Sequence, residues 1–209
     1  MLVVSSSNVY GSQAREMPVD ERVPVQPANP YARSKVEQEQ AALRYHEKDG
    51  LDVVIVRPFN HAGPGQQVGF VVPDIAQQIA AIETGKQAPV LTVRALDPGL
   101  DLTDVRDVVQ AYHLAVRSGE TGQIYNVGSG TAWTVRALVD ALRSLSTVQA
   151  IEVRQASPGT VARPALVCDS RRLRARVGWS PHVPIETTLR DTLNFWRQQE
   201  GAVEPAGGS

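Results

Sequence analysis

Short runs of apolar residues alternate with longer stretches of helical spacing along the whole chain. The short runs are rich in β-branched residues and too brief for helices, which predicts strands. The predicted strands are Leu2–Val4, Leu51–Arg57, Val90–Val93, Ile124–Val127, Ile151–Val153 and Leu166–Val167. Strands that alternate with helices favour parallel pairing, with the helices covering the sheet. The pattern therefore predicts an α/β protein.

Between those runs, apolar residues recur at spacings of three and four, which predicts amphipathic helices. Capping residues, prolines and glycines mark their ends. The predicted helices run from Pro30 to Gly50, from Pro73 to Gly85, from Asp107 to Val116, from Thr134 to Leu145, from Asp169 to Val177 and from Ile185 to about Gln199. Trp179 and Trp196 lie among aliphatic residues, which predicts core positions. Residues 200–209 have little apolar content, which predicts a loose tail.

The start of the first predicted helix carries a tyrosine and a lysine four residues apart. Asn29 suits a capping position and Pro30 the first helical position. Tyr31 and Lys35 then lie on one helix face, because residues at i and i+4 are neighbours. Ser6 follows the apolar strand Leu2–Val4, where the strand end would present its hydroxyl to a ligand.

These three side chains suit proton transfer to a sugar or alcohol oxygen. A free tyrosine has a pKa of about 10, and a neighbouring cation such as Lys35 lowers it. Ser6 would hold the same oxygen by a hydrogen bond. Side chains do not supply hydride, so a nicotinamide cofactor would be needed. A solvated helix face is the competing interpretation of Tyr31 and Lys35 alone.

Composition narrows the class of protein. A hydrophobic content of 42% with 21% charged residues argues against disorder, and a net charge of −1 provides no basis for nucleic-acid binding. The single cysteine, Cys168, is predicted to be a small buried residue and not a nucleophile. No signal peptide, membrane-spanning run or metal-ligand cluster is evident. We therefore expect a cytoplasmic protein without a metal or membrane partner.

The chain resembles the extended short-chain dehydrogenase/reductase family, the NAD-dependent epimerase/dehydratase group that acts on nucleotide sugars. The resemblance covers Met1 to about Gln199. It is carried by the segments Ser5–Gly11, Asn29–Lys35, Arg57–Gly65, Asp101–Asp107 and Tyr125–Gly130. Within the family, the Arg57–Gly65 segment followed by Gly69–Asp74 is most similar to GDP-4-dehydro-6-deoxy-mannose reductases and GDP-mannose 4,6-dehydratases.

The resemblance implies a fold and a domain organisation. The fold would be the C-terminal part of a Rossmann-like doubly wound parallel sheet plus a smaller α/β substrate-binding domain. Residues 1–150 would be the remaining half of the NAD(P)-binding domain, interleaved with substrate-domain segments at about 61–100. Residues 151–199 would be the C-terminal substrate-binding region, followed by the flexible tail at 200–209.

The resemblance also implies roles for particular residues, carried over position by position. Ser6, Tyr31 and Lys35 match the catalytic residues of the family. The implied cofactor-binding residues are Tyr31, Lys35, Pro58 and Asn60. The implied substrate-binding residues are Ser7, Asn8, Asn60, Val72 and Arg163. Arg57 is expected either to contact the cofactor or to close an ion pair.

Members of the family bind the dinucleotide pyrophosphate with a Gly-x-x-Gly-x-x-Gly turn between a strand and a helix. These 209 residues contain no such motif. Met1–Ser5 matches the strand that carries the catalytic serine, so about the first four strands of the family's sheet are expected to be missing. We therefore expect NAD or NADP as the family's cofactor and expect this chain alone not to retain it.

Departures from the family pattern discriminate between activities. Dehydratases of the family carry a threonine at the position of Ser6 and a carboxylate at that of Asn8, and an asparagine does not exchange a proton. This favours an NAD(P)H-dependent reductase of a GDP-linked 4-keto-6-deoxy sugar over a 4,6-dehydratase or an epimerase. Relatives also carry an arginine where this chain has Leu100. The remaining alternative is an inactive remnant or a subunit whose sheet a partner chain completes, and a homodimer is likewise expected by resemblance.

Overall fold

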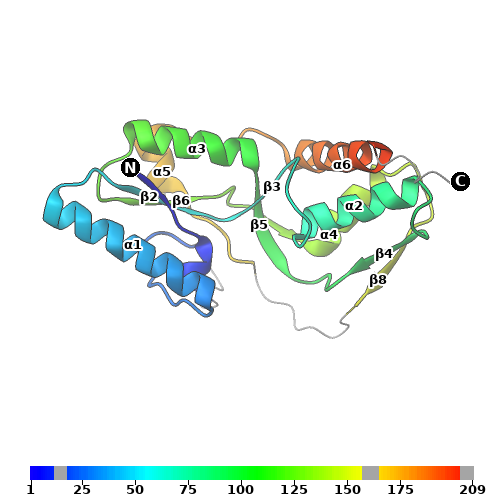
Figure 1. The fold of residues 1–209 in the computed structure, drawn as a ribbon, viewed down its shortest axis with the longest axis horizontal. Helices are drawn as coiled ribbons and strands as arrows, with labels where there is room; N and C mark the ends of the chain where they lie inside the picture. Colours follow the sequence, from blue (N-terminus) through cyan, green and yellow to red (C-terminus); the bar gives the residue numbers. More distant parts are fainter. Residues whose placement is uncertain (12–17, 157–164, 203–209) are drawn as a thin grey trace, which may run out of the picture. The chain divides into compact units, whose positions relative to one another are not determined.

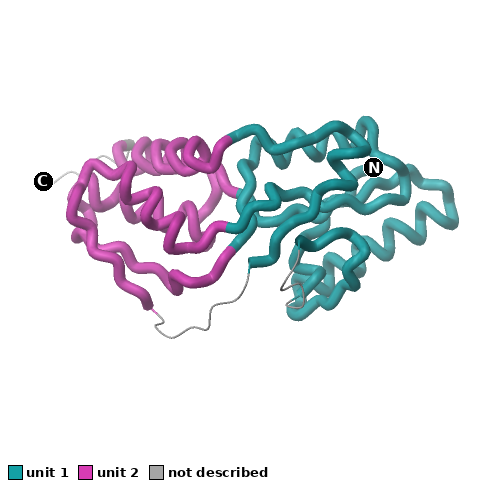
Figure 2. The backbone as a smooth tube through the Cα atoms, turned by 180° about the vertical axis from the view of Figure 1, so that it is seen from behind, with its two compact units in different colours: residues 1–61, 100–132, 164–183 teal, residues 62–99, 133–163, 184–209 magenta. Residues whose placement is uncertain are grey.

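The computed structural model describes residues 1–11, 18–156 and 165–202. The chain forms two compact units, which Figure 2 shows in two colours. Unit 1 contains residues 1–61, 100–132 and 164–183, and unit 2 contains residues 62–99, 133–163 and 184–209. Residues 62–99 therefore belong to a different unit from the two segments that flank them. Residues 133–156 belong to the same unit as 62–99, whereas the sequence analysis placed 133–150 in the first domain.

A three-stranded parallel sheet forms the centre of unit 1. Its strands are β1 (Leu2–Val4), β2 (Val54–Pro58) and β6 (Ile124–Val127), in the order β1-β2-β6. Leu2 pairs with Val54 and Ile55 with Ile124. All five residues of β2 are buried, as expected for a central parallel strand.

Helices cover both faces of this sheet. They are α1 (Pro30–Asp49), α3 (Val105–Ser118) and α5 (Arg171–Val177), and the 3-10 helix η1 (Ser7–Tyr10) follows β1 (Figure 1). Val54 and Val56 of β2 pack in one apolar cluster with α3 and α5, whereas Ile55 packs in another with Ala42 of α1. Successive strand side chains point to opposite faces, so the sheet is wound on both sides. The predicted α/β class with a Rossmann-like sheet is confirmed.

Unit 2 is built mainly of helices. Its helices are α2 (Val71–Glu83), α4 (Val135–Ser144) and α6 (Ile185–Ala202), and α2 packs against both others. A two-stranded parallel sheet joins β4 (Val90–Val93) and β8 (Glu152–Gln155). The helices contribute fully buried leucine and isoleucine side chains at helical spacings, which are Ile75, Ile79, Leu138, Leu142, Leu189 and Leu193.

Three short strands were not predicted. They are β3 (Asn60–Ala62), β5 (Gly99–Asp104) and β7 (Ala132–Thr134), and they form a sheet in the order β3-β5-β7. Two of them have only three residues, which is too short for an apolar periodicity to show. The third, β5, carries Asp101, Thr103 and Asp104 among its apolar residues, all of them buried.

Several predicted boundaries were wrong. Helix α2 begins at Val71, two residues before Pro73. The predicted strand at 166–167 is absent from the described residues, because Val19 pairs with Cys168 through one isolated bridge instead of a ladder. Helix α6 extends to Ala202, since Lys86 donates to the Glu200 carboxylate at 2.9 Å and to its carbonyl at 2.8 Å. The remainder of the predicted tail, 203–209, lies outside the described residues.

The predicted core positions of Trp179 and Cys168 are confirmed, since their exposed fractions are 2% and 3%. The Trp179 indole N–H donates to the Asp107 carbonyl at 2.9 Å. Burial raises the pKa of the Cys168 thiol well above its usual value, which makes it a poor nucleophile. Trp196 is only partly buried. In the part of the chain that the structure describes, no helix is both long enough and apolar enough to cross a bilayer.

Candidate active site

Tyr31 stands in the first turn of α1. The Asn29 side chain accepts a hydrogen bond from the Ala32 backbone N–H at 2.8 Å, and Pro30 occupies the first helical position. Both features are those predicted, and they fix where the helix begins. The Tyr31 side chain is 51% exposed although it is aromatic, so its phenol is available to a ligand.

Lys35 connects Tyr31 to the strand that precedes Ser6. Its ammonium lies 5.9 Å from the centroid of the Tyr31 ring. The same ammonium donates to the Val4 carbonyl at 2.8 Å and to Gln38 Oε1 at 3.1 Å. Helix α1 is therefore held against the carboxyl end of β1 by the residue that the sequence predicted to act beside Tyr31.

Ser6 is the first residue after β1 whose side chain takes part in capping. Its backbone is extended and its Oγ accepts a hydrogen bond from the Asn8 N–H at 3.2 Å, so it caps η1. Ser6 and Ser7 are 9% and 6% exposed, whereas Asn8 is exposed. The hydroxyl keeps its donor capacity, because only its acceptor side is used in this bond.

The cofactor-binding candidates Pro58 and Asn60 lie at or just after the carboxyl end of β2, at the same end of the sheet as Ser6. The Ser5 N–H donates to the Val56 carbonyl at 2.8 Å, so the two parallel strands end side by side. Pro58 is the last residue of β2 and is buried, and Asn60 is exposed at the start of β3. Ligands of open α/β sheets bind at the carboxyl ends of the strands, which is where Ser6 and Asn60 lie.

Two predicted substrate-binding residues lie outside the described part of unit 1. Val72 lies in the first turn of α2, in unit 2, and is 2% exposed. Arg163 lies outside the described residues. In the described part of the chain, no group of three histidine, cysteine or carboxylate side chains could hold a metal ion.

The structure adds a second tyrosine near Tyr31. Burial raises the pKa of Tyr112, on α3, to about 12, and the nearby Tyr31 adds to this rise. Tyr112 is partly buried. This neighbour was not predicted from the sequence, because α1 and α3 are far apart along the chain.

The structure also decides the role of Arg57, which the sequence left open. Arg57 is 4% exposed and forms a two-pronged ion pair with Glu39 of α1, with Nε donating to Oε1 at 2.9 Å and Nη2 to Oε2 at 2.6 Å. Sequence reasoning missed Glu39. The available signal was its position eight residues after Tyr31 and four after Lys35, on the same helix face.

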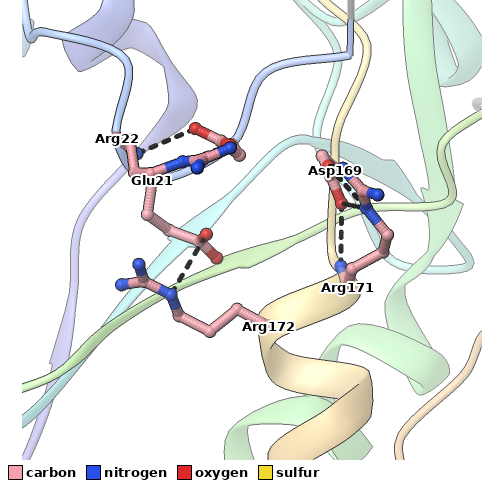
Figure 3. Close-up of a pocket in the computed structure, with 6 residues that line it drawn as sticks. Glu21, Arg22, Asp169, Arg171 and Arg172 are labelled. Carbon is pink, nitrogen blue, oxygen red and sulfur yellow. Dashed lines mark hydrogen bonds and ion pairs between the residues drawn. The ribbon is translucent and has the colours of Figure 1, made fainter.

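A pocket of about 430 Å³ lies elsewhere in unit 1 (Figure 3). Its lining consists of charged residues: Asp20, Glu21, Arg22, Asp169, Arg171 and Arg172. The three arginines are each paired with one of the three carboxylates, at 2.5, 2.6 and 3.6 Å. The pocket is therefore internally neutral, and no predicted site residue lines it.

Comparisons with known proteins agree with this fold. The sequence profile described as GDP-mannose 4,6 dehydratase matches residues 1–192. A GDP-6-deoxy-D-mannose reductase from Pseudomonas aeruginosa is 37% identical over 95% of this chain and 66% of its own length. A dTDP-glucose 4,6-dehydratase from Streptomyces niveus is 30% identical over 97% of this chain and 58% of its own length.

A solved structure gives the same result. RMD from Pseudomonas aeruginosa, complexed with NADPH, superposes with a TM-score of 0.89 and 36% identity over 95% of this chain and 66% of that one. The chain belongs to the GDP-mannose 4,6-dehydratase family, and the resemblance drawn from its motifs is confirmed at that level. It spans less than two thirds of the length of these relatives.

Proposed function

We propose that this chain carries the proton-transfer residues of an NAD(P)H-dependent reductase that acts on a nucleotide-linked 4-keto-6-deoxy sugar, with a GDP sugar favoured. The observation that carries the proposal is the Lys35 ammonium, which lies against the Tyr31 ring and bonds the Val4 carbonyl two residues before Ser6. The 37% identity to a GDP-6-deoxy-D-mannose reductase supports the choice of reaction and sugar.

Each catalytic candidate has a distinct part in the proposed reaction. Ser6 donates its hydroxyl hydrogen to the sugar carbonyl oxygen and holds it in place. Tyr31 gives its proton to the alkoxide that forms at that oxygen. Lys35 stabilises the phenolate left behind, because an ammonium at this distance attracts the negative charge. The proton and the oxygen are thus held within one site, which favours transfer.

The residues at the reacting end fit a nicotinamide riboside. Lys35 uses two of its three N–H donors within the protein, which leaves one for a ribose hydroxyl. Tyr31 is exposed, and Asn60 and Pro58 stand at the adjoining strand end. The bound cofactor would supply the hydride. The 209 residues contain no glycine-rich turn for its pyrophosphate.

The proposed substrate-binding residues are Ser7, Asn8, Asn60, Val72 and Arg163. The two from η1 follow Ser6 directly, and Asn8 is exposed at the sheet edge. An asparagine there can hydrogen-bond a sugar hydroxyl but does not take up a proton. This supports reduction over 4,6-dehydration, whose elimination step needs a further acid or base.

A second candidate function is that of a subunit whose sheet a partner chain completes, or of an inactive remnant. The observation in its favour is the sheet order β1-β2-β6, in which β1 is an edge strand of the described sheet. Unpaired strand edges favour pairing with another chain. A homodimer or a partner-completed sheet are both proposals on this ground.

Product analysis separates the candidates. The purified chain, alone and fused to the glycine-rich half of a family relative, is incubated with GDP-4-keto-6-deoxy-mannose and NADPH, or with GDP-mannose and NAD, and the sugar products are identified by NMR. Reduction of the keto sugar with oxidation of NADPH supports the reductase. Formation of a keto sugar from GDP-mannose would instead identify the activity as that of a dehydratase and contradict the reductase proposal. Absence of turnover on both substrates, with and without the fused half, would refute the proposed catalysis and favour the second candidate.

A further inference from the structure

Arg57 joins β2 to the two elements of unit 1 beside the predicted catalytic residues, which are α1 with Tyr31 and Lys35 and η1 next to Ser6. It belongs to β2, which leads to Asn60. Its Nε and Nη2 bond both carboxylate oxygens of Glu39, on the helix that carries Tyr31 and Lys35. Its Nη1 donates to the Tyr10 hydroxyl at 2.9 Å, in the 3-10 helix that Ser6 caps. One guanidinium group thus has a partner on each side of the candidate site.

The contact to η1 is itself fixed in direction. The guanidinium lies over the Tyr10 ring, 4.9 Å from its centroid. The Tyr10 hydroxyl donates to Asn126 Oδ1 at 2.7 Å, and Asn126 Nδ2 donates to the Val19 carbonyl at 2.8 Å. Tyr10 and Asn126 are both fully buried. The Tyr10 hydroxyl therefore has one donor and one acceptor partner, which leaves it a single orientation.

Apart from the Lys35 bond to the Val4 carbonyl, helix α1 packs mainly through apolar side chains, which include the partly buried Val36 and Leu43. Its buried residues are Ala32, Glu39 and Ala42, two of which are alanines with small side chains. Apolar contacts of this size are not directional. A two-pronged arginine–carboxylate pair is directional, because two parallel hydrogen bonds fix the relative angle of both groups. Glu39 lies two turns beyond Tyr31 and one beyond Lys35, so it fixes the face that carries both.

We infer that Arg57, acting through Glu39 and Tyr10, is a positioning residue that sets Tyr31 and Lys35 relative to Ser6. The inference rests on the proposed function, since it concerns the same three catalytic candidates. Arg57 itself is not a catalytic residue, because its donors face Glu39 and Tyr10 and not the exposed phenol. The Lys35 bond to the Val4 carbonyl is the contact that this arrangement places within reach.

A role in positioning is distinguishable from a role in stability alone. Replacing a buried ion pair by apolar side chains of similar size is often neutral or stabilising, whereas removing one partner is costly. The double variant Arg57→Met/Glu39→Leu is therefore expected to fold with an unchanged or higher melting temperature. If Arg57 positions α1, the same variant loses the directional contact while it keeps its stability.

The experiment measures amide hydrogen exchange by mass spectrometry on the full chain, without substrate or cofactor. In Arg57→Met/Glu39→Leu, exchange over residues 30–38 is expected to rise about tenfold, with β6 and α3 unchanged. Tyr10→Phe keeps the ion pair and removes the hydroxyl, so exchange is expected to rise over residues 5–11 and not in α1. This milder variant keeps the test informative if the double variant fails to fold.

The matched control is Glu83→Gln, which breaks another two-pronged pair, with Arg197 of unit 2, at 2.7 and 2.8 Å. It should leave exchange in residues 5–11 and 30–38 unchanged. Unchanged exchange in both segments of the test variants, or an equal rise across all of unit 1, would overturn the inference. Because no turnover is needed, this outcome is independent of whether the chain is a reductase. Where turnover is measurable, kcat should fall about tenfold or more in the double variant, with KM within about twofold.

Discussion

At the scale of single residues, the surroundings of Tyr31 and Lys35 suit the proposed proton transfer. Tyr31 is exposed, although aromatic side chains are usually buried. The ammonium of its neighbour Lys35 donates a hydrogen bond to the carbonyl of Val4 in β1. In the proposed reaction, the exposed phenol donates the proton and the adjacent ammonium stabilises the phenolate that remains. The proposed proton transfer therefore depends directly on these two residues.

In the chain fused to the glycine-rich half of a family relative, Tyr31→Phe should abolish turnover of the keto sugar while substrate binding persists. The ring and its contact with Lys35 remain, but the proton donor is lost, which removes a contribution of about 10²–10⁴-fold. Turnover is measured as NADPH oxidation and binding by calorimetry with the GDP sugar. Tyr45→Phe, at an exposed position further along α1, is the matched control and should be neutral. Unchanged turnover in Tyr31→Phe would remove Tyr31 from the mechanism.

Gly128 shows a second constraint at the residue scale. A Cβ at this position would lie 2.5 Å from Cys168 Cβ and 2.8 Å from its sulfur. Gly128→Ala should therefore destabilise the protein by about 1–3 kcal/mol through overpacking. Urea denaturation measures the change. Gly201→Ala, in α6 with open space around the position, should be neutral or stabilising, and equal effects of the two variants would contradict the close approach.

At the scale of elements, local signals predicted the ends of α1. Asn29, Pro30 and Gly50 occupy the capping and terminal positions expected from sequence, with Gly50 at a φ of 69° in the left-handed region. The start of α2 was missed because Phe70 precedes it and provides no side-chain cap. Helix ends are predictable where the sequence provides its own capping group.

Asn29→Ala should weaken α1 at its first turn. The Asn29 side chain satisfies the Ala32 N–H, and loss of such a cap costs about 1 kcal/mol. The free energy of unfolding is measured by urea denaturation. Gln40→Ala, at an exposed position of the same helix, should change it little. A cost for Gln40→Ala as large as that for Asn29→Ala would show that the cap has no specific role.

At the scale of the whole chain, an ion pair in unit 2 connects two helices that are far apart in sequence. Arg197 of α6 donates two hydrogen bonds to the Glu83 carboxylate at the end of α2. These bonds are the largest of the effects that lower the pKa of Glu83 from 4.5 to about 2. A lowered folded pKa means that the pair stabilises fully above pH 4.5 and is lost as the pH falls toward about 2.

Glu83→Gln should therefore remove part of the acid sensitivity of unfolding. Between pH 4.5 and 2, the wild-type chain should lose about 1–2 kcal/mol more stability than the variant, after allowance for solvent screening. Thermal unfolding followed by circular dichroism across this range measures the difference. Glu152→Gln, in an exposed pair with Arg154, is the control, and parallel pH profiles of wild type and Glu83→Gln would contradict the assignment.

The 209-residue chain should bind NADPH weakly or not at all. The residues proposed to contact the nicotinamide riboside are present, but the sequence contains no Gly-x-x-Gly-x-x-Gly turn to bind the pyrophosphate. A fluorescence titration with NADPH measures the affinity. A micromolar dissociation constant would show that other residues of this chain, or a partner copy, bind the phosphates.

The sequence by itself determined what depends on neighbours along the chain: the helical face with Tyr31 and Lys35, the caps of α1 and α4, the strand cores and the motifs of the family. Only the tertiary structure decided the partner of Arg57, the neighbour of Tyr112 and the strands β3, β5 and β7. Glu39 lies 18 positions from Arg57, and Tyr10 lies 47 positions from it. Such contacts form when packed elements bring distant side chains together, and no local periodicity encodes which buried charge meets which.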